Sequence, residues 1–320
     1  MIKFLGIAVV LATGLTAASA TEIVNFGVQP ATQPIYIARA AGFLDPIEKK
    51  HDVKIEFKSF AYGAPENQAL AAGELQIAAA GMGPAVLASS RLPVELIAID
   101  ILDQTAVLVP PQSTVKDIKD LRGKKIAFPG TGSQQYPLIL KALADAGMKE
   151  NDVELIKAQP SQIGNLLRSG SVDAGITFDP HISSAIVDGS AKLLMKSSAI
   201  FPLKSGHYVG GGIYARQDFI RKHPGLVEDL MVAVIKSIKL IETKPETAID
   251  MWTSQIGFLR PVIAYSVSNG ISVFHSDIAP EKDALEKYVT LLRTSGILEA
   301  GDEPKINSSF AQKAQAAADK

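Results

Sequence analysis

The sequence predicts an α/β fold made of two similar lobes, and a duplicated unit is the main reason. The unit occurs at residues 69–89 as ALAAGELQIAAAGMGPAVLAS and at residues 166–186 as LLRSGSVDAGITFDPHISSAI. Each copy has a glycine, a short apolar strand, a tight loop and then a proline where a helix should begin. Proline suits that position because its missing N–H has no partner inside the helix. The elements before the two copies also match, and strands alternating with helices indicate βαβ units.

The first lobe is expected to span residues 21–104, after a leader at residues 1–20. Its strands are predicted at residues 23–28, 53–60 and 94–101, and its helices at residues 34–42 and 64–72. The first copy of the unit continues from the helix at 64–72 and leads to the strand at 94–101. The apolar and β-branched content of the strand segments supports this assignment.

The second lobe, residues 105–209, repeats the pattern. We predict strands at 125–128 and 153–157, helices at 135–146 and 161–168, and then the second copy of the unit. The chain must cross between the lobes at least twice, and residues 103–110, with the extended apolar run 105–109, and residues 206–214 are the candidates. Gly210, Gly211 and Gly212 interrupt the second candidate, which indicates either a bend, a close approach of two backbones, or an ordinary loop.

The remainder, residues 210–320, should return to the first lobe and be mainly helical. Helices are predicted at residues 218–222, 224–243, 245–255, 261–269 and 280–292, four of them opened by proline. In the second of these helices, apolar residues recur every three or four positions and define one buried face: Leu226, Leu230, Val234, Ile238 and Ile241.

The first twenty residues have the pattern of a secretory signal peptide. Lys3 precedes an apolar run from Phe4 to Leu15, and Ala18-Ser19-Ala20 is a small-x-small cleavage site, so the mature chain should begin at Thr21. The alternative is an uncleaved membrane anchor, which the short run disfavours. With no cysteine in the chain, a bacterial periplasm is the expected compartment.

The composition argues against several classes of function. The formal net charge is −1 and basic residues are scattered, so neither nucleic acid nor an anionic membrane is an expected partner. Nucleotide-binding glycine motifs, a G-x-S-x-G elbow and ligand-spaced histidines are missing. We therefore assign no catalytic residue, no metal and no cofactor, although a catalytic triad without a sequence motif stays open.

Polar loops that follow strands are the best candidate site, because ligands of parallel sheets bind beyond the carboxyl ends of the strands. None of these loops contains Lys or Arg, so an anion would be held by backbone N–H groups, hydroxyls and amides. Singly, each residue could equally be a turn former, a helix cap or, for methionine, core filling. The candidate ligand-binding residues are Thr32, Gln33, Gly81, Met82, Gly83, Thr131, Ser133, Gln134, Phe178, Asp179 and His181.

Three acids lie near the predicted cleft: Asp100, Asp103 and Asp179. If two of them face it, a ligand with an amine end becomes attractive. If they cap helices, as Asp179 before Pro180 could, they say nothing about the ligand.

Four segments resemble the periplasmic solute-binding proteins of ABC importers of the nitrate, sulfonate and taurine type. They are A-x-G-E-L-Q-I-A-x-A-G-x-G-P (residues 71–84), D-L-R-G-K-K-I-A-F-P (120–129), G-S-V-D-A-G-I-T-F-D-P (170–180) and A-R-Q-D-F-I-R-K-H-P (215–224). The resemblance implies a type II periplasmic-binding fold with two crossover strands. It also implies a monomer that captures a small organic anion or zwitterion, and an inner-membrane ABC permease as partner.

Two alternatives stay open at this point. One is an enzyme of the same fold, similar to the synthases of pyrimidine precursors, which the signal peptide disfavours. The other is a binding subunit that serves a membrane sensor. The identity of the ligand, among sulfonates, taurine, nitrate, pyrimidines and aromatic acids, is also open.

Overall fold

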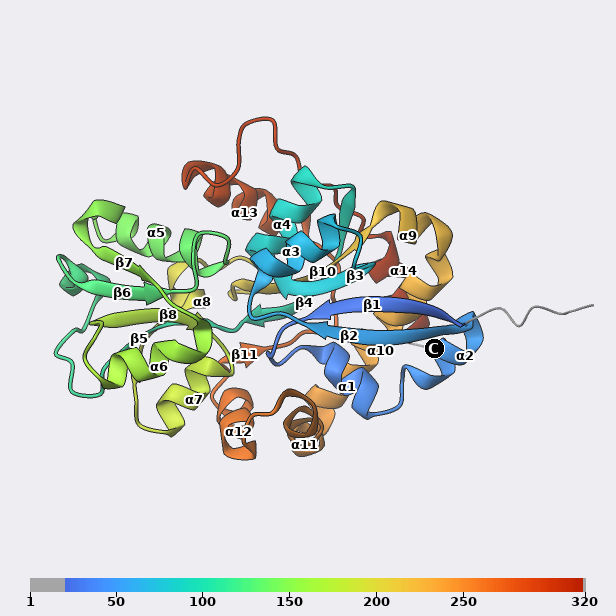
Figure 1. The fold of residues 1–320 in the computed structure, drawn as a ribbon, viewed down its shortest axis with the longest axis horizontal. Coiled ribbons are helices and arrows are strands. Elements are labelled where there is room, and N and C mark those ends of the chain that lie inside the picture. The colour runs from blue at the N-terminus through green and yellow to red at the C-terminus, as the bar shows by residue number, and fades with distance from the viewer. Residues whose placement is uncertain (1–20, 319–320) are drawn as a thin grey trace, which may run out of the picture.

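Two β-sheets organise the part of the chain that the computed structural model describes, residues 21–318 (Figure 1). The first sheet has the order β11-β4-β10-β3-β1-β2, and the second has the order β7-β6-β8-β5-β9. We call the parts that contain them lobe 1 and lobe 2. The mixed α/β architecture with two sheets confirms the predicted fold class. The expected signal peptide lies outside the described residues.

The strands of lobe 1 are β1 (Glu22–Val28), β2 (Val53–Ser59), β3 (Ile77–Gly81), β4 (Val94–Asp103), β10 (Val209–Arg216) and β11 (Ser272–Val273). The pairs β1–β2 and β1–β3 are parallel, whereas β10 is antiparallel to both of its neighbours, β3 and β4. The carboxyl ends of β1, β3 and β4 therefore meet at one edge, which faces lobe 2.

The strands of lobe 2 are β5 (Thr105–Val109), β6 (Lys125–Phe128), β7 (Glu154–Lys157), β8 (Ala174–Phe178) and β9 (Lys192–Lys196). Here β6 is parallel to β7 and β8, while β5 is antiparallel to β8 and β9. Both lobes thus combine parallel βαβ strands with an antiparallel strand that enters from the other lobe, β10 in lobe 1 and β5 in lobe 2, and lobe 1 adds the short antiparallel edge strand β11.

The helices of the first two thirds are α1 (Pro34–Ala40), α2 (Asp45–His51), α3 (Gly63–Ala71), α4 (Met82–Arg91), α5 (Gln135–Asp145), α6 (Pro160–Arg168), α7 (His181–Val187) and α8 (Ser197–Ile200), with short 3-10 helices at Ile118–Leu121 and Glu150–Asp152. The C-terminal helices are α9 (Gln217–Lys222), α10 (Pro224–Thr243), α11 (Pro245–Ile256), α12 (Arg260–Ser268), α13 (Lys282–Thr294) and α14 (Ser309–Ala318). None of the described helices combines the length and apolar character needed to cross a membrane.

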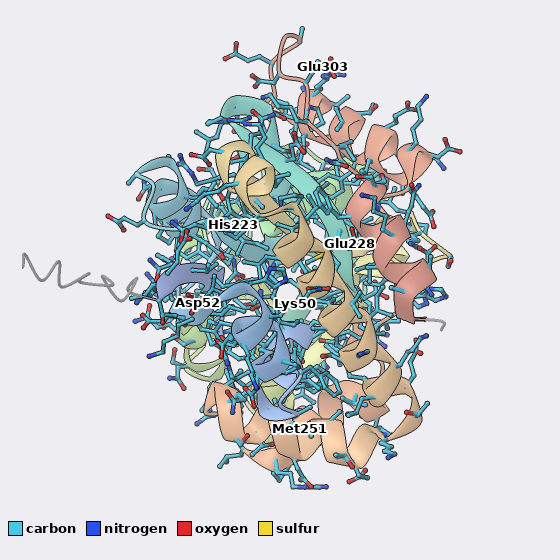
Figure 2. All side chains as sticks on the ribbon, turned by 90° about the vertical axis from the view of Figure 1, so that its right-hand side faces the viewer. Lys50, Asp52, His223, Glu228, Met251 and Glu303 are labelled. Carbon is cyan, nitrogen blue, oxygen red and sulfur yellow. The ribbon has the colours of Figure 1, made fainter. Side chains whose placement is uncertain are left out.

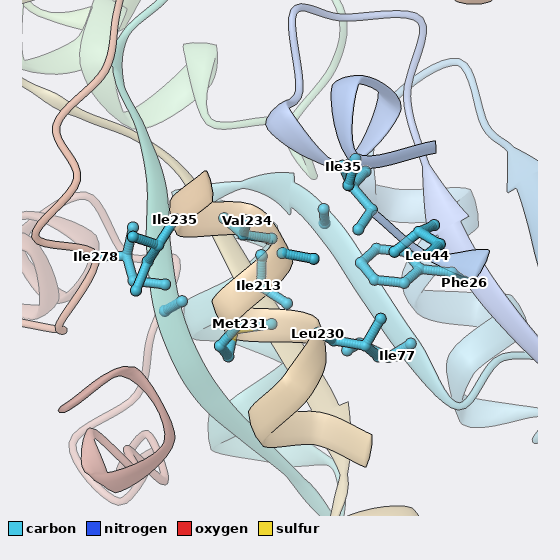
Figure 3. Packing of buried hydrophobic residues seen from close by; sticks show 14 of the residues in the cluster. Phe26, Ile35, Leu44, Ile77, Ile213, Leu230, Met231, Val234, Ile235 and Ile278 are labelled. Atoms are coloured by element: carbon cyan, nitrogen blue, oxygen red, sulfur yellow. The ribbon is translucent and has the colours of Figure 1, made fainter. Parts of the chain in front are cut away.

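The buried face predicted for α10 is confirmed. Its stripe from Leu226 to Ile241 is buried in one cluster with Phe26, Ile77 and Ile213 of the first sheet, as Figure 3 shows for part of it. At the outer end of lobe 1, α2, which carries Lys50, lies against α10 (Figure 2). Lys50 and His51 both contact Asp229 there.

Several predicted elements differ from the structure. Helix α2 was not predicted, although Asp45 and Pro46 open it and its last turn is basic. Helix α7 begins at His181, one residue after Pro180, and α13 begins at Lys282, two residues after Pro280. The C-terminal part of the chain returns to lobe 1 but also contacts lobe 2, because α12 packs against α7 and α13 packs against α5.

The first crossover lies between β4 and β5. Asp103 and Gln104 have positive φ angles of 60° and 68°, which non-glycine residues rarely adopt, and Thr105 then starts the second sheet. On the returning strand, a Cβ atom on Gly210 would lie 2.0 Å from the carbonyl oxygen of Asp103. The glycine run therefore marks a close approach of two backbones, one of the readings that the sequence left open.

Candidate functional site

The first copy of the duplicated unit faces Gln134 of lobe 2 across the cleft. The Gln134 Oε1 atom accepts a hydrogen bond of 3.0 Å from the backbone N–H of Met82, the first residue of α4. Its Nε2 atom donates to the Thr105 hydroxyl at 2.8 Å. An N–H group at a helix N-terminus is a natural partner for an anion. The amide oxygen of Gln134 therefore marks a position that an anionic oxygen would occupy.

Glycine is required around Gln134 because of space. A Cβ atom on Gly81 would lie 2.8 Å from Gln134 Oε1, and one on Gly83 would lie 3.1 Å from Gln134 Cα. Gly81 has φ −56° and ψ 149°, a conformation that any residue adopts. The missing side chains leave the end of β3 and the start of α4 open to a group from lobe 2.

The lobes are closed on each other in this structure. The space left between them is a cavity of about 10 Å³, lined by Gln29, Tyr62, Gly63, Gly81, Pro84, Gln104, Ser133, Gln134, Gln135 and Phe178. Such a volume holds about one water molecule. A larger ligand would enter only if the lobes part or if Gln134 moves.

The second copy of the unit uses its own carboxylate at the helix end. Asp179 Oδ1 accepts hydrogen bonds from the backbone N–H and the hydroxyl of Ser183. The residue preceding α7 is Pro180, so the predicted N-cap role of Asp179 is one residue out of register, although the carboxylate still satisfies a first-turn N–H. Burial raises the pKa of Asp179, and the hydrogen bonds from serines oppose that rise.

His181 lies between two aromatic rings. Its ring centroid is 5.2 Å from that of Phe178 and 5.3 Å from that of Phe258, both edge to face. Burial lowers the pKa of His181 to about 4. The imidazole is therefore neutral at pH 7 and contributes an apolar wall with two ring nitrogens instead of a positive charge.

A chain of buried polar groups joins the lobes on the other side of the cleft. Thr32 donates from its hydroxyl to Ser272 at 2.7 Å, and Ser272 donates to Asp179 Oδ2 at 3.4 Å. Gln33 is engaged within lobe 1, where its amide bonds the backbone of Gln29 and Ala79. Thr32 is thus connected to Asp179 of lobe 2 through Ser272, whereas Gln33 holds the β1–α1 loop in place.

The remaining predicted residues divide in the same way. The Met82 side chain is fully buried in the core and only its backbone N–H faces Gln134. Ser133 Oγ donates to the carbonyl of Gly130 and so stabilises its own turn. Thr131 is exposed to solvent. Sequence reasoning missed Gln29, Tyr62 and Gln104 as cavity-lining residues, because glutamine and tyrosine carry no motif and Gln104 reaches the cleft through its unusual backbone.

These contacts separate the roles of Ser133 and Gln134, two neighbouring candidates in one predicted ligand-binding loop. We expect Gln134→Ala to strengthen ligand binding roughly tenfold, because the Gln134 amide no longer competes with the anionic group of the ligand for the N–H of Met82. Ser133→Ala should change affinity by less than about threefold. Isothermal titration of both single variants and the double variant measures this. Equal effects in the two single variants, or a loss of affinity in Gln134→Ala, would contradict the assignment.

The three acids near the cleft have three different environments. Asp103 Oδ2 contacts His207 Nδ1 at 2.6 Å, and its Oδ1 accepts from the Ser197 hydroxyl at 2.9 Å. Because Ser197 donates to the carboxylate and not to the imidazole, these residues lack the order of a catalytic triad. Asp179 accepts hydrogen bonds from Ser183 in the first turn of α7, whereas the carboxylate of Asp100 accepts none from the described residues. Within residues 21–318, no group of His, Cys, Asp or Glu is arranged to hold a metal ion.

Two α/β lobes that close over a polar cleft define the class of periplasmic-binding-protein folds. The model of the NMT1/THI5-like family matches residues 29–248, and the chain belongs to that family. This confirms the resemblance to sulfonate- and taurine-type binding proteins.

Similar proteins support the same class. The taurine-binding periplasmic protein of Escherichia coli (strain K12) is 29% identical over 238 residues, which cover 72% of this chain and 69% of that protein. The alkanesulfonate-binding protein SsuA of Xanthomonas axonopodis pv. citri, solved with MOPS bound, superimposes with a TM-score of 0.75 at 21% identity, covering 89% of this chain and 97% of SsuA. The periplasmic aliphatic sulphonate binding protein SsuA of Escherichia coli superimposes with a TM-score of 0.70 at 21% identity, covering 86% of this chain and 91% of that protein.

Proposed function

We propose that this protein is the periplasmic substrate-binding component of an ABC importer, which captures a small organic anion such as a sulfonate or aminosulfonate. The observation that carries the proposal is the hydrogen bond from Met82 N to Gln134 Oε1 across the closed cleft. It identifies a helix N-terminus of lobe 1 that takes an oxygen acceptor from the other side. A sulfonate offers three such oxygens and needs no cationic side chain there.

Several features support a binding role. The hinge at Asp103 and Gln104 separates the two sheets, and ligand binding between lobes would shift the molecule toward the closed form. The relatives named above are binding proteins. We propose accordingly that the protein releases its ligand unchanged to a membrane permease, and that residues 1–20 direct export and are then removed.

The test is a ligand titration of protein purified from the periplasm of a Gram-negative expression host. Ethanesulfonate, 2-aminoethanesulfonate and nitrate are titrated by calorimetry and by thermal unfolding. A ligand at a hundredfold excess over its Kd should stabilise the fold by about 2.7 kcal/mol. Intact mass should correspond to a chain that begins at Thr21, and the ligand should be recovered unchanged. No response to any of the three anions would refute the proposal, and steady turnover would show an enzyme instead.

A further inference from the structure

Asp100 is a buried acid without a hydrogen-bond partner. Its exposed fraction is 2%, and among the described residues neither carboxylate oxygen accepts a hydrogen bond. Burying a carboxylate in this state is costly, because the charge loses its hydration and gains nothing in return. Asp103 and Asp179, the other two acids of the region, are satisfied by His207, Ser197 and Ser183.

Asp100 lies beside the position marked by Gln134. A Cβ atom on Gly211 would be 2.8 Å from Asp100 Oδ1. Gly211 is the Cα partner of Gly81 in the antiparallel β3–β10 ladder, and directly opposite residues share one face of a sheet. Gln134 Oε1 occupies the space over Gly81, as described above. The carboxylate and the proposed anion position are therefore neighbours over a floor of two glycines.

A second unsatisfied acceptor follows directly after the end of the same strand, β4. Gln104 donates from Nε2 to the carbonyl of Gly210 at 3.0 Å, which fixes the amide, while its Oε1 atom accepts no hydrogen bond from a described residue. Gln104 is 4% exposed and lines the cavity. Asp100 thus presents unsatisfied oxygens beside Gly211, and Gln104 presents one at the cavity, next to a site whose other feature is the N–H donor of Met82.

We propose that Asp100 and Gln104 form a subsite for a hydrogen-bond donor of the ligand, an ammonium group, while the acidic end of the same ligand takes the N–H of Met82. The inference rests on the proposed function and narrows it from organic anions to zwitterions of the aminosulfonate kind. An ammonium group has three donors and no acceptor, which matches oxygens that lack donors. A plain alkanesulfonate would leave both acceptors unsatisfied.

The experiment compares 2-aminoethanesulfonate with ethanesulfonate, which lacks only the amine, on the wild type and on Asp100→Asn. Hydrogen bonds to charged groups predict that the wild type prefers the aminosulfonate by roughly 10- to 100-fold. Asp100→Asn should remove most of that preference by weakening binding of the aminosulfonate. A circular-dichroism melt of the variant verifies that it is folded.

Glu66→Gln is the matched control. Glu66 is another fully buried acid of lobe 1, and only its Oε2 atom accepts a hydrogen bond, from Gln29. Its Oε1 atom accepts none from the described residues and lies beside strand β1, against the Cβ position of Gly27 instead of that of Gly211. This variant should keep the preference for the aminosulfonate. Equal affinity of the wild type for both sulfonates, or an equal loss of preference in Glu66→Gln, would refute the subsite and leave the proposed function intact. If the wild type binds neither sulfonate nor nitrate, both proposals fail.

Discussion

Asp100→Asn is expected to stabilise the folded protein, and more strongly at pH 8 than at pH 5. Burial raises the pKa of Asp100 from its ordinary 3.8 to about 7. The folded state therefore holds this proton more tightly than the unfolded chain does. Ionising the carboxyl costs folding free energy, and asparagine, which does not ionise, removes that cost.

The pH dependence of this stability gain follows from the pKa values of Asp100 in the unfolded and the folded state. Below pH 3.8 the carboxyl is protonated in both states and costs nothing by this route. Between 3.8 and about 7 the unfolded chain alone releases the proton, so the cost grows; above about 7 it is complete. The full difference corresponds to about 4 kcal/mol, and about two fifths of it is already present at pH 5. The gain from Asp100→Asn should thus increase by about 2.5 kcal/mol between pH 5 and pH 8.

Urea unfolding of the wild type and the variant at both pH values measures this increase. Asp103→Asn is the informative control, because Asp103 is equally buried but bonded to His207 and Ser197. That substitution should destabilise the protein at both pH values. A gain for Asp100→Asn that does not change with pH would contradict the idea of an ionisable, unsatisfied carboxyl.

A residue that destabilises the protein is informative about function. Most core positions favour groups that pack without cost, and unsatisfied buried acids are retained mainly where an activity needs them. Asp100 fits this pattern because it combines loss of stability with a place beside the cleft. If Asp100→Asn is both more stable and less selective, the loss of binding cannot be attributed to unfolding.

The sequence predicted the alternation of strands and helices well, because apolar periodicity and proline at helix starts are local signals. The stripe of α10 and the strand at residues 125–128 are examples. The duplicated unit pointed to Gly81, Met82 and Gly83, and the polar loop after a lobe 2 strand pointed to Gln134; in the structure these residues meet across the cleft. They meet because both loops follow strands whose ends converge.

The roles of individual site residues could not be predicted in the same way. Whether Asp179 serves its own helix, or Ser133 its own turn, depends on side-chain geometry that no spacing encodes. Asp103 and Asp100 are three residues apart on one strand, yet one is fully bonded and the other is not. The difference arises from His207 and Ser197, about a hundred residues later in the chain.

Gly81→Val is expected to reduce ligand binding by roughly a hundredfold, because the new side chain fills the proposed position of the anionic group. Its Cβ atom alone would lie 2.8 Å from Gln134 Oε1 and 2.9 Å from Gln134 Cδ. The backbone at φ −56° and ψ 149° accepts valine without strain. Since the conflicting atoms belong to the end of a flexible side chain, Gln134 can turn away and the fold should survive.

Titration with ethanesulfonate and 2-aminoethanesulfonate tests the effect, with the melting temperature as a check on folding. Gly301→Val is the matched control, because a Cβ atom at Gly301 meets no heavy atom within 4 Å. Both sulfonates should lose affinity in Gly81→Val, since their acidic group is the same, whereas Asp100→Asn should affect only the ligand with the amine. The two variants therefore separate the two ends of the ligand. Undiminished binding by Gly81→Val would place the acidic group away from the start of α4.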